Sequence, residues 1–343
     1  MMAPKALSLL SKKIGKNLDL VQGAGGNTSC KDNEILWVKA SGFWLSEASK
    51  KNIFVPVRYK EIIKRLNNNE LDPISPEVIE FGGSNLKPSI ETSLHALMPH
   101  KYVVHTHSVN AIANIVLNDG HLKIGKLLEG LKWEWVKYVR PGLPLTLEVQ
   151  KAIQSNPDII ILANHGVVFG ANSLKKINTL IYDFEKRINT IKRKVKIQEK
   201  PQVIESFDMF SEYKFVNHPL VQSIAFDDKS ISIISSGSLY PDHVVFLGAG
   251  PICVLTIAEF KAFVEKFNAT TNANIIKVIV VKKLGVFLQS SLKNGSEEML
   301  HCLANVLLRV GNIKNLRFLT SDEESELLGW DAEKYRQNIN LSV

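Results

Sequence analysis

Residues 101–108 read KYVVHTHS, and this stretch places two histidines in a predicted β-strand. Side chains at positions i and i+2 of a strand point to the same face, so His105 and His107 present their imidazoles side by side. A second stretch, residues 158–166 (DIIILANHG), predicts a buried strand that ends at His165. Three neutral imidazoles with one open position are typical of a catalytic zinc site, although iron, cobalt and manganese accept similar ligands. We therefore predict one divalent metal ion per chain, with Zn²⁺ as the first choice.

Each histidine taken alone is more simply explained as a buried or solvated structural residue. The H-x-H pair by itself leaves the structural and the metal-binding interpretations open. Metal binding is favoured by the other motifs that accompany the histidines, which are three glycine- and serine-bearing loops spaced along the first half of the chain. They are residues 21–29 (VQGAGGNTS), 38–42 (VKASG) and 87–91 (KPSIE).

These loops, followed by H-x-H and N-H-G, resemble the class II aldolase/adducin family in type and in order over residues 7–195. A later stretch, residues 238–245 (SLYPDHVV), resembles the segment that follows the aldolase part of the long rhamnulose-1-phosphate aldolase proteins. In those proteins a short-chain dehydrogenase domain comes next. The chain ends at Val343, so we expect that domain to be absent.

The resemblance implies an α/β fold, with a class II aldolase-like three-layer domain in which helices flank a central β-sheet. It also implies a metal-dependent aldehyde-lyase that cleaves a ketose or ketose phosphate. The metal would stabilise the enediolate that forms when the carbon–carbon bond breaks. Glu91 matches the family position of the general acid/base, whereas the residue taken alone is explained by its favourable place at a helix N-terminus. A homotetramer is the assembly that the family implies.

The three loops also form a candidate phosphate cradle. Glycine allows backbone N–H groups to approach an anion closely, and serine adds hydroxyl donors. Ile90 stands where many members of the family carry a second serine, which removes one donor. The alternative is that residues 23–26 form only a tight turn. The candidate substrate- or phosphate-binding residues are Gly25, Gly26, Asn27, Ser41, Gly42 and Ser89.

Two other functions compete with the aldolase interpretation. A sugar-phosphate epimerase of the ribulose-5-phosphate 4-epimerase type would use the same metal ligands and would break and remake the same bond. An adducin-like module would keep the fold for assembly without catalysis. The complete histidine set together with Glu91 argues against the second alternative, because a non-catalytic module has no physical need of these groups.

Composition narrows the possible classes of protein and of binding partner. The chain has 343 residues, of which 45% are hydrophobic and 22% charged, and this is ordinary for a globular protein. There is no apolar run of membrane-spanning length and no apolar signal core near Met1, so we expect a cytoplasmic protein that has no membrane partner. The three cysteines are far apart, which favours free thiols. Much of the net charge of +8 lies in residues 186–200, which lack interleaved aromatics, so we expect a solvated helix face and no nucleic-acid partner.

The length favours two domains, and we place the boundary at residues 199–201. Residues 1–200 are then the metal-binding domain, and residues 201–343 form a smaller α/β domain of unknown role. Apolar and β-branched patterns predict strands at residues 35–38, 52–57, 230–234, 243–247, 275–281 and 285–288. Helical patterns cover residues 6–20, 58–67, 91–97, 111–117, 147–155, 174–196, 257–267 and 296–309.

Overall fold

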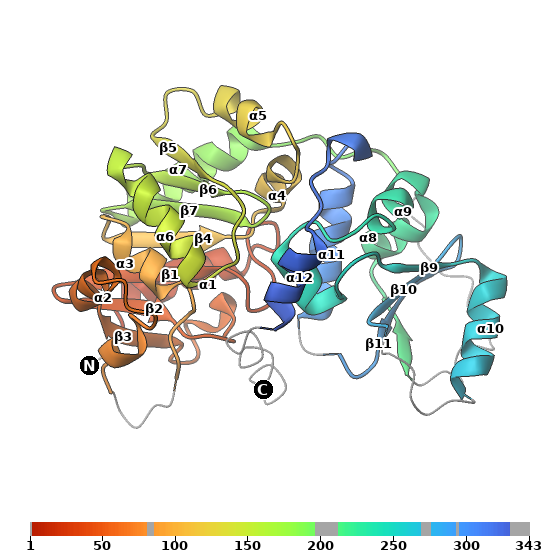
Figure 1. Cartoon of the computed structure of the whole chain (residues 1–343), viewed down its shortest axis with the longest axis horizontal. Coiled ribbons are helices and arrows are strands. Elements are labelled where there is room, and N and C mark those ends of the chain that lie inside the picture. The colour runs from red at the N-terminus through yellow and green to blue at the C-terminus, as the bar shows by residue number, and fades with distance from the viewer. Residues whose placement is uncertain (1, 81–85, 196–211, 269–275, 293–294, 330–343) are drawn as a thin grey trace. The chain divides into compact units, whose positions relative to one another are not determined.

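The computed structural model describes residues 2–80, 86–195, 212–268, 276–292 and 295–329 (Figure 1). The chain divides into two compact units, and the division falls between Asn189 and Thr190. The boundary expected at residues 199–201 lies outside the described residues. Each unit has its own sheet and its own core.

The first unit is built on a seven-stranded sheet. Its strands are β1 (Asn27–Asp32), β2 (Ile35–Lys39), β3 (Phe54–Arg58), β4 (Tyr102–Thr106), β5 (Trp133–Val136), β6 (Ile159–Leu162) and β7 (Gly166–Ala171). Their spatial order is β3-β2-β1-β4-β7-β6-β5, so the strand that carries His105 is the central one. Neighbouring strands are antiparallel except β5 and β6, which are parallel.

Helices cover both faces of this sheet (Figure 1). On one face lie α2 (Tyr59–Asn67), α3 (Thr92–Leu97) and α6 (Leu143–Ala152), whose apolar side chains join those of the strands in two core clusters. On the other face lie α1 (Lys5–Gly15), α4 (Val109–Ile115) and α7 (Leu174–Ile188). α5 (Gly120–Leu127) packs against α4 and α7, and short helical turns complete the unit at Leu45–Glu47, Ser75–Glu77 and Ile153–Ser155. The three-layer α/β fold implied by the resemblance is confirmed.

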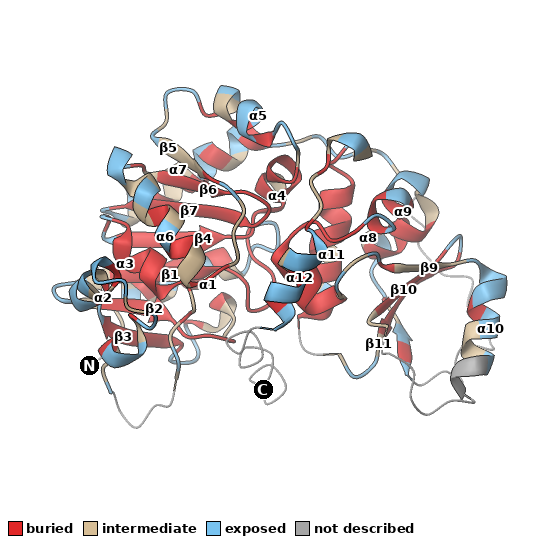
Figure 2. Ribbon diagram, viewed as in Figure 1, coloured by how far each residue is buried: buried red, intermediate tan, exposed pale blue. Residues whose placement is uncertain are grey.

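Alternation along the strands decides which side chains reach each layer. Val103 belongs to the core cluster under α3 and α6, and His105, two residues further along β4, lies on the same face. Thr28 of β1 points to the opposite face, where its hydroxyl meets that of Ser11 in α1 at 2.6 Å. β4 and β7, at the centre of the sheet, are buried at every residue (Figure 2), so a polar side chain on them is kept from solvent.

The second unit is smaller and also has α/β architecture. Its four-stranded sheet has the order β8-β11-β10-β9, formed by β8 (Tyr213–Phe215), β9 (Cys253–Leu255), β10 (Val278–Val281) and β11 (Gly285–Gln289). Phe260 and Ile279 are fully buried in its core. Its helices are α8 (Pro219–Gln222), α9 (Asp228–Ile234), α10 (Ile257–Asn268), α11 (Ser296–Leu307) and α12 (Ser321–Leu328), with short turns at Ser223–Phe226 and Ile313–Asn315.

Two predicted strands of this unit are wrong. Residues 230–234 lie in α9, because the side chain of Asp227 caps the helix by accepting a hydrogen bond from the amide of Ser230. His243–Leu247 forms a π-helical turn that is buried at every residue. Both stretches are rich in β-branched residues, and capping and burial outweigh that weak preference for strand.

The helix predicted at residues 174–196 is also shorter than expected. It ends at Ile188, because Asn189 takes an extended conformation with ψ of 123°. Beyond it, the guanidinium of Arg193 donates two hydrogen bonds to the carboxylate of Asp227, at 2.8 and 3.1 Å. Part of the basic run is therefore used inside the second unit. In the part of the chain that the structure describes, no helix is both long and apolar enough to cross a bilayer.

Candidate metal centre

The three predicted ligands meet at one end of the central strands. His105 lies near the end of β4, and His107 follows that strand directly. His165 lies in the tight turn between β6 and β7, where Leu162 pairs with Gly166. Asn164 closes the turn in the left-handed region, with φ of 50°, which asparagine tolerates better than most residues. The tight turn brings the third histidine back to the first two.

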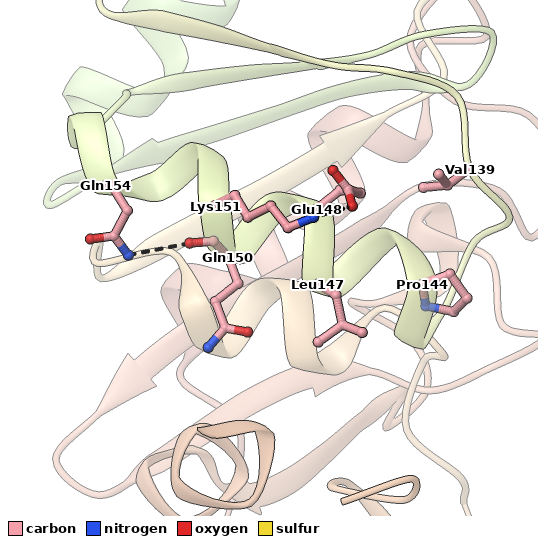
Figure 3. A pocket seen from close by; sticks show the side chains of 7 residues that line it. All are labelled: Val139, Pro144, Leu147, Glu148, Gln150, Lys151 and Gln154. Atoms are coloured by element: carbon pink, nitrogen blue, oxygen red, sulfur yellow. Dashed lines mark hydrogen bonds and ion pairs between the residues drawn. The ribbon is translucent and has the colours of Figure 1, made fainter. Parts of the chain in front are cut away.

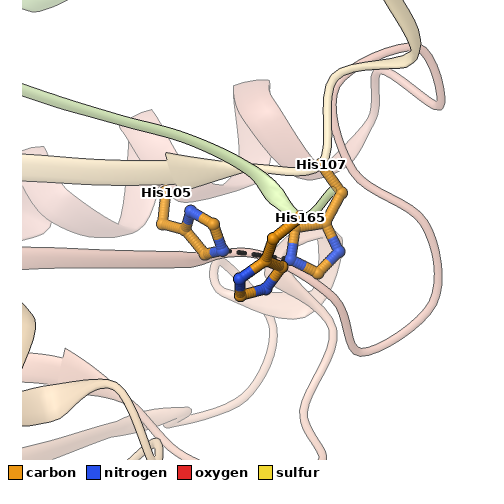
Figure 4. Close-up of side chains that lie close together, drawn as sticks. All are labelled: His105, His107 and His165. Atoms are coloured by element: carbon orange, nitrogen blue, oxygen red, sulfur yellow. Dashed lines mark hydrogen bonds between the residues drawn. The ribbon is translucent and has the colours of Figure 1, made fainter. Parts of the chain in front are cut away.

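The cluster has the geometry of a metal site. All three rings are buried, and one ligand atom from each lies within 4.8 Å of the others (Figure 4). The Nε2 atoms of His105 and His107 are 3.0 Å apart. Nitrogen ligands of a tetrahedral zinc ion are about 3.3 Å from one another. The separation of these two nitrogens is therefore close to what a divalent ion requires, and the ligand atom of His165 lies within 4.8 Å of both.

A hydrogen bond on the far side of His105 sets its tautomer. Its Nδ1 lies 3.1 Å from the carbonyl oxygen of Val167, which can only accept a hydrogen bond. Nδ1 therefore carries the proton, and Nε2 presents its lone pair to the cluster. Metal-binding histidines are typically oriented by a hydrogen bond of this kind. The donor set and its orientation fit a divalent cation.

Glu91 lies beside the histidines, directly before α3. Asn27 Nδ2 donates to its Oε2 at 2.6 Å. The same Oε2 is 3.6 Å from His105 Nε2, and Oε1 is 3.7 Å from His165 Nε2. Burial alone would raise the pKa of Glu91, but positive charge at the neighbouring histidines outweighs burial and lowers this pKa to about 2. When the rings act as neutral ligands, a divalent ion held by them would supply that positive charge instead. The group is therefore a carboxylate at neutral pH.

The glycine of N-H-G is required by close packing. A Cβ atom at Gly166 would lie 2.3 Å from the carbonyl oxygen of Thr106, and 3.1 Å and 3.3 Å from ring carbons of His105 and His107. If the cluster binds a metal, we expect Gly166→Ala to weaken binding roughly 10- to 100-fold, because the added methyl group would push the turn away from His105 and His107 and disturb the orientation of the ligands.

Competition with a chelator measures that affinity. Gly311→Ala is the matched control, because a Cβ atom there would have no neighbour within 4 Å. Unchanged metal affinity in Gly166→Ala would show that the histidines tolerate displacement of the turn.

The second and third candidate loops lie side by side. Ala40 pairs with Pro88, and the backbone amides of Ser41 and Ser89 each donate to a carbonyl across the two loops. The amide of Gly25 donates within its own loop. These three amides are therefore already hydrogen-bonded, and an anion at the loops would rely on the serine hydroxyls and on other amides.

Gly26, Asn27 and Gly42 have separate structural reasons for their identity. Gly26 has φ of 64°, and a Cβ atom there would lie 2.5 Å from Val21 Cγ1 and 2.9 Å from the carbonyl oxygen of His105. Gly42 also has positive φ, at 82°. The side chain of Asn27 is directed to Glu91 and not to an open anion site. The first loop therefore supports the histidine strand and Glu91 directly.

Lys39 is a buried charge that the sequence did not reveal. Its side chain is 1% exposed, and its ammonium donates to the carbonyls of Ala24 at 2.6 Å and Phe43 at 2.8 Å. It thus joins the first loop to the second. In the sequence, a lysine at the end of an apolar strand does not indicate that its ammonium will be buried between two loops. Its positive charge favours an anion near these loops.

A separate open groove of about 700 Å³ runs along α6 (Figure 3). It is not part of the candidate site, because none of the predicted ligands or loop residues lines it. Its lining consists of Val139, Pro144, Leu147, Glu148, Gln150, Lys151 and Gln154.

Comparison with known proteins agrees with this fold. Residues 6–190 match the family described as the class II aldolase and adducin N-terminal domain, so the chain belongs to this family. Among curated relatives, the chain is 30% identical over 200 residues to "Uncharacterized oxidoreductase YuxG" of Bacillus subtilis (strain 168). The aligned region covers 52% of this chain and 28% of that protein. It is 26% identical over 181 residues to an L-fuculose phosphate aldolase of Methanococcus vannielii, and this alignment covers 48% of this chain and 90% of that protein.

Solved structures include similar folds. The N-terminal class II aldolase domain of a conserved protein from Thermoplasma acidophilum is 25% identical with a TM-score of 0.48, over 53% of this chain and 90% of that chain. An L-fuculose 1-phosphate aldolase is 23% identical with a TM-score of 0.39, over 55% of this chain and 85% of that one.

Proposed function

We propose that this protein is a metal-dependent aldehyde-lyase that cleaves a ketose or ketose phosphate. The observation that carries the proposal is the buried cluster of three histidines with the Glu91 carboxylate 3.6 and 3.7 Å from two of their ring nitrogens. Membership of the class II aldolase family and similarity to an L-fuculose phosphate aldolase support it. The fold alone would not, because related folds host different reactions.

The residues that would hold the ion are His105, His107 and His165, and Zn²⁺ is the ion that this ligand set suits best. A divalent ion there supplies a Lewis acid that polarises the substrate carbonyl and offsets the negative charge that develops as the carbon–carbon bond breaks. The carbonyl of Val167 keeps His105 in the tautomer that can bind the ion. Burial of the cluster excludes water, which strengthens these electrostatic effects.

Glu91 is the group that moves a proton to and from carbon in this proposal. Its Oε2 is held by Asn27, while Oε1 accepts no hydrogen bond from the described residues. Oε1 is therefore the oxygen that takes the proton. Because the residue is 5% exposed, bulk water cannot readily replace it in that role.

We also infer that the first unit, expected over residues 1–200 and ending at Asn189 in the structure, is the catalytic domain. We infer further that the protein assembles as a homotetramer and that it acts in the cytoplasm. The support is the resemblance of the chain to its family. Light scattering of the purified protein tests the assembly, and a monomer would contradict it.

The function is tested by loading the purified protein with Zn²⁺ and supplying a panel of ketose phosphates and free ketoses. Release of an aldehyde is the expected result. Conversion of one ketose phosphate to its epimer without aldehyde would favour the epimerase alternative. Absence of both metal binding and turnover would instead favour an assembly module.

The phosphate cradle gives a further prediction. Ser41→Ala removes one hydroxyl donor and is expected to weaken binding of a phosphorylated ketose by about 1.5–3 kcal/mol, which raises KM roughly 10- to 150-fold. Free ketoses should be unaffected. Ser89→Ala is a less specific variant, because the Ser89 hydroxyl also accepts a hydrogen bond from the amide of Glu91 at 3.3 Å.

A substitution in the glycine loop, such as Gly26→Val, is unsuitable for this test. The valine side chain would clash with Val21 and with the backbone of His105. Inorganic phosphate provides an independent measurement, since it should inhibit the enzyme and raise its Tm. If it does neither, and free ketoses turn over as well as their phosphates, the loops are structural turns.

A further inference from the structure

Alternate side chains of β1 form hydrogen bonds along the neighbouring helix α3. Asn27 bonds to the carboxylate of Glu91 just before that helix begins. Two residues on, Ser29 Oγ is 2.8 Å from Nδ1 of His95, which lies within α3. Both members of this second pair are 0% exposed. The spacing of two residues places Asn27 and Ser29 on one face of the strand.

Lys31 continues the series at the other end of α3. Its ammonium donates to the carbonyl oxygens of Ala96, at 2.9 Å, and Met98. These are among the last carbonyls of the helix, which have no partner within it. Burial lowers the pKa of Lys31 to about 8, so this is a partly desolvated charge held by two backbone acceptors. β1 thus contacts α3 from before its start to its end.

The same strand is bound by its backbone to the histidine strand. In the ladder between β1 and β4, Asn27 pairs with His105 and Ser29 with Val103. β1 therefore contacts a candidate metal ligand on one side and the segment that carries Glu91 on the other. No other strand of the first unit has both contacts among the interactions described above.

α3 cannot fix the position of Glu91 by itself. It has six residues, and Glu91 forms no side-chain cap at its start. Helices shorter than about 12 residues are marginal alone, so contacts with the rest of the fold hold them in place. The separation between Glu91 and His105 is consequently set by what anchors α3 to the sheet.

We propose that Ser29, through His95, and Lys31 are positioning residues that hold the Glu91 carboxylate at its working distance from the histidine cluster. The inference rests on the proposed function of Glu91 in the same site. Neither residue touches the reacting atoms. Their loss would let α3 shift along the sheet, so Glu91 would be misplaced while the three histidines stayed in their strand and turn.

The test compares Ser29→Ala and Lys31→Met with wild type, on the panel substrate that turns over fastest. We expect kcat to fall roughly 10- to 100-fold, as for a misplacement of about 1 Å. KM should stay within a factor of about two, because uniform binding is unchanged. Co²⁺ titrated into the metal-free protein should bind each variant as it binds wild type. Ser29→Thr, which keeps the hydroxyl, should restore most of kcat.

Ser11→Ala is the matched control, because it deletes an equally buried hydroxyl that meets β1 on its opposite face. It should lower Tm without lowering kcat. An equal loss of kcat in this control, or a loss of Co²⁺ affinity in Ser29→Ala, would mean that general stability and not positioning is responsible.

A double variant separates this inference from the proposed function. If Ser29 acts only by placing Glu91, Ser29→Ala should change the residual kcat of Glu91→Gln little. A full further loss in that background would overturn the positioning role. Wild-type turnover in Glu91→Gln alone would instead overturn the assignment of Glu91, whatever Ser29→Ala does.

Discussion

His107→Ala is expected to release the metal ion and to abolish most of the activity. The side chain is buried, and its Nε2 lies 3.0 Å from that of His105, so its removal leaves two ligands and a cavity. If the ion contributes about 4 kcal/mol to transition-state stabilisation, its loss lowers kcat/KM roughly a thousandfold. Elemental analysis of the purified variant should find far less than one ion per chain.

A second buried histidine provides the control. His100 lies just before β4, and its Nε2 is 2.9 Å from Asp158. His100→Ala should lose some stability but keep its metal. Treatment of wild type with a chelator should reproduce the loss of activity, and added Zn²⁺ should restore it. Equal metal content in wild type and His107→Ala would show that the ion, if any, is bound elsewhere.

The sequence predicted this cluster because its pattern follows strand geometry. The H-x-H spacing requires only a single extended strand, and N-H-G requires only that a buried strand end in a turn. Both conditions are local, so they can be recognised without knowing the sheet order. That the two segments meet depends on the family resemblance, because β4 and β7 are neighbours only in the folded sheet.

The structure around the cluster was harder to predict. Residues 27–32 (NTSCKD) are polar and look like a loop, yet they form β1. Four of their side chains have hydrogen-bonding partners in the layers above or below, namely Asn27, Thr28, Ser29 and Lys31. Lys39 is another such case, since only the fold shows two loop carbonyls meeting its ammonium. In the second unit, residues 230–234 have a strand-like composition, and a cap from Asp227 makes them a helix. Side-chain hydrogen bonds decide all three, with partners distant in sequence for β1 and Lys39 and a local cap for residues 230–234.

Glu91→Gln is expected to keep the metal and to lose most of the activity. Glutamine has nearly the same shape, and its amide oxygen can still accept the hydrogen bond from Asn27. It cannot take up a proton, so general acid/base catalysis is lost, which typically costs about a hundred- to ten-thousandfold. KM should change little, because the volume of the site and its ligands are retained. Single-turnover kinetics on the best panel substrate measures the loss in the chemical step.

Two further variants show whether the loss of proton transfer causes the loss of activity in Glu91→Gln. Glu91→Asp keeps the acid but withdraws it by one methylene, so it should fall between wild type and Glu91→Gln. Glu77→Gln changes an equally buried carboxylate that accepts a hydrogen bond from Arg65 at 2.7 Å, away from the cluster, and should lower stability alone. Near wild-type turnover in Glu91→Gln, with the metal in place, would assign proton transfer to another group. Because Oε1 of Glu91 accepts no hydrogen bond from the described residues, this carboxylate has the unused acceptor that the reaction requires.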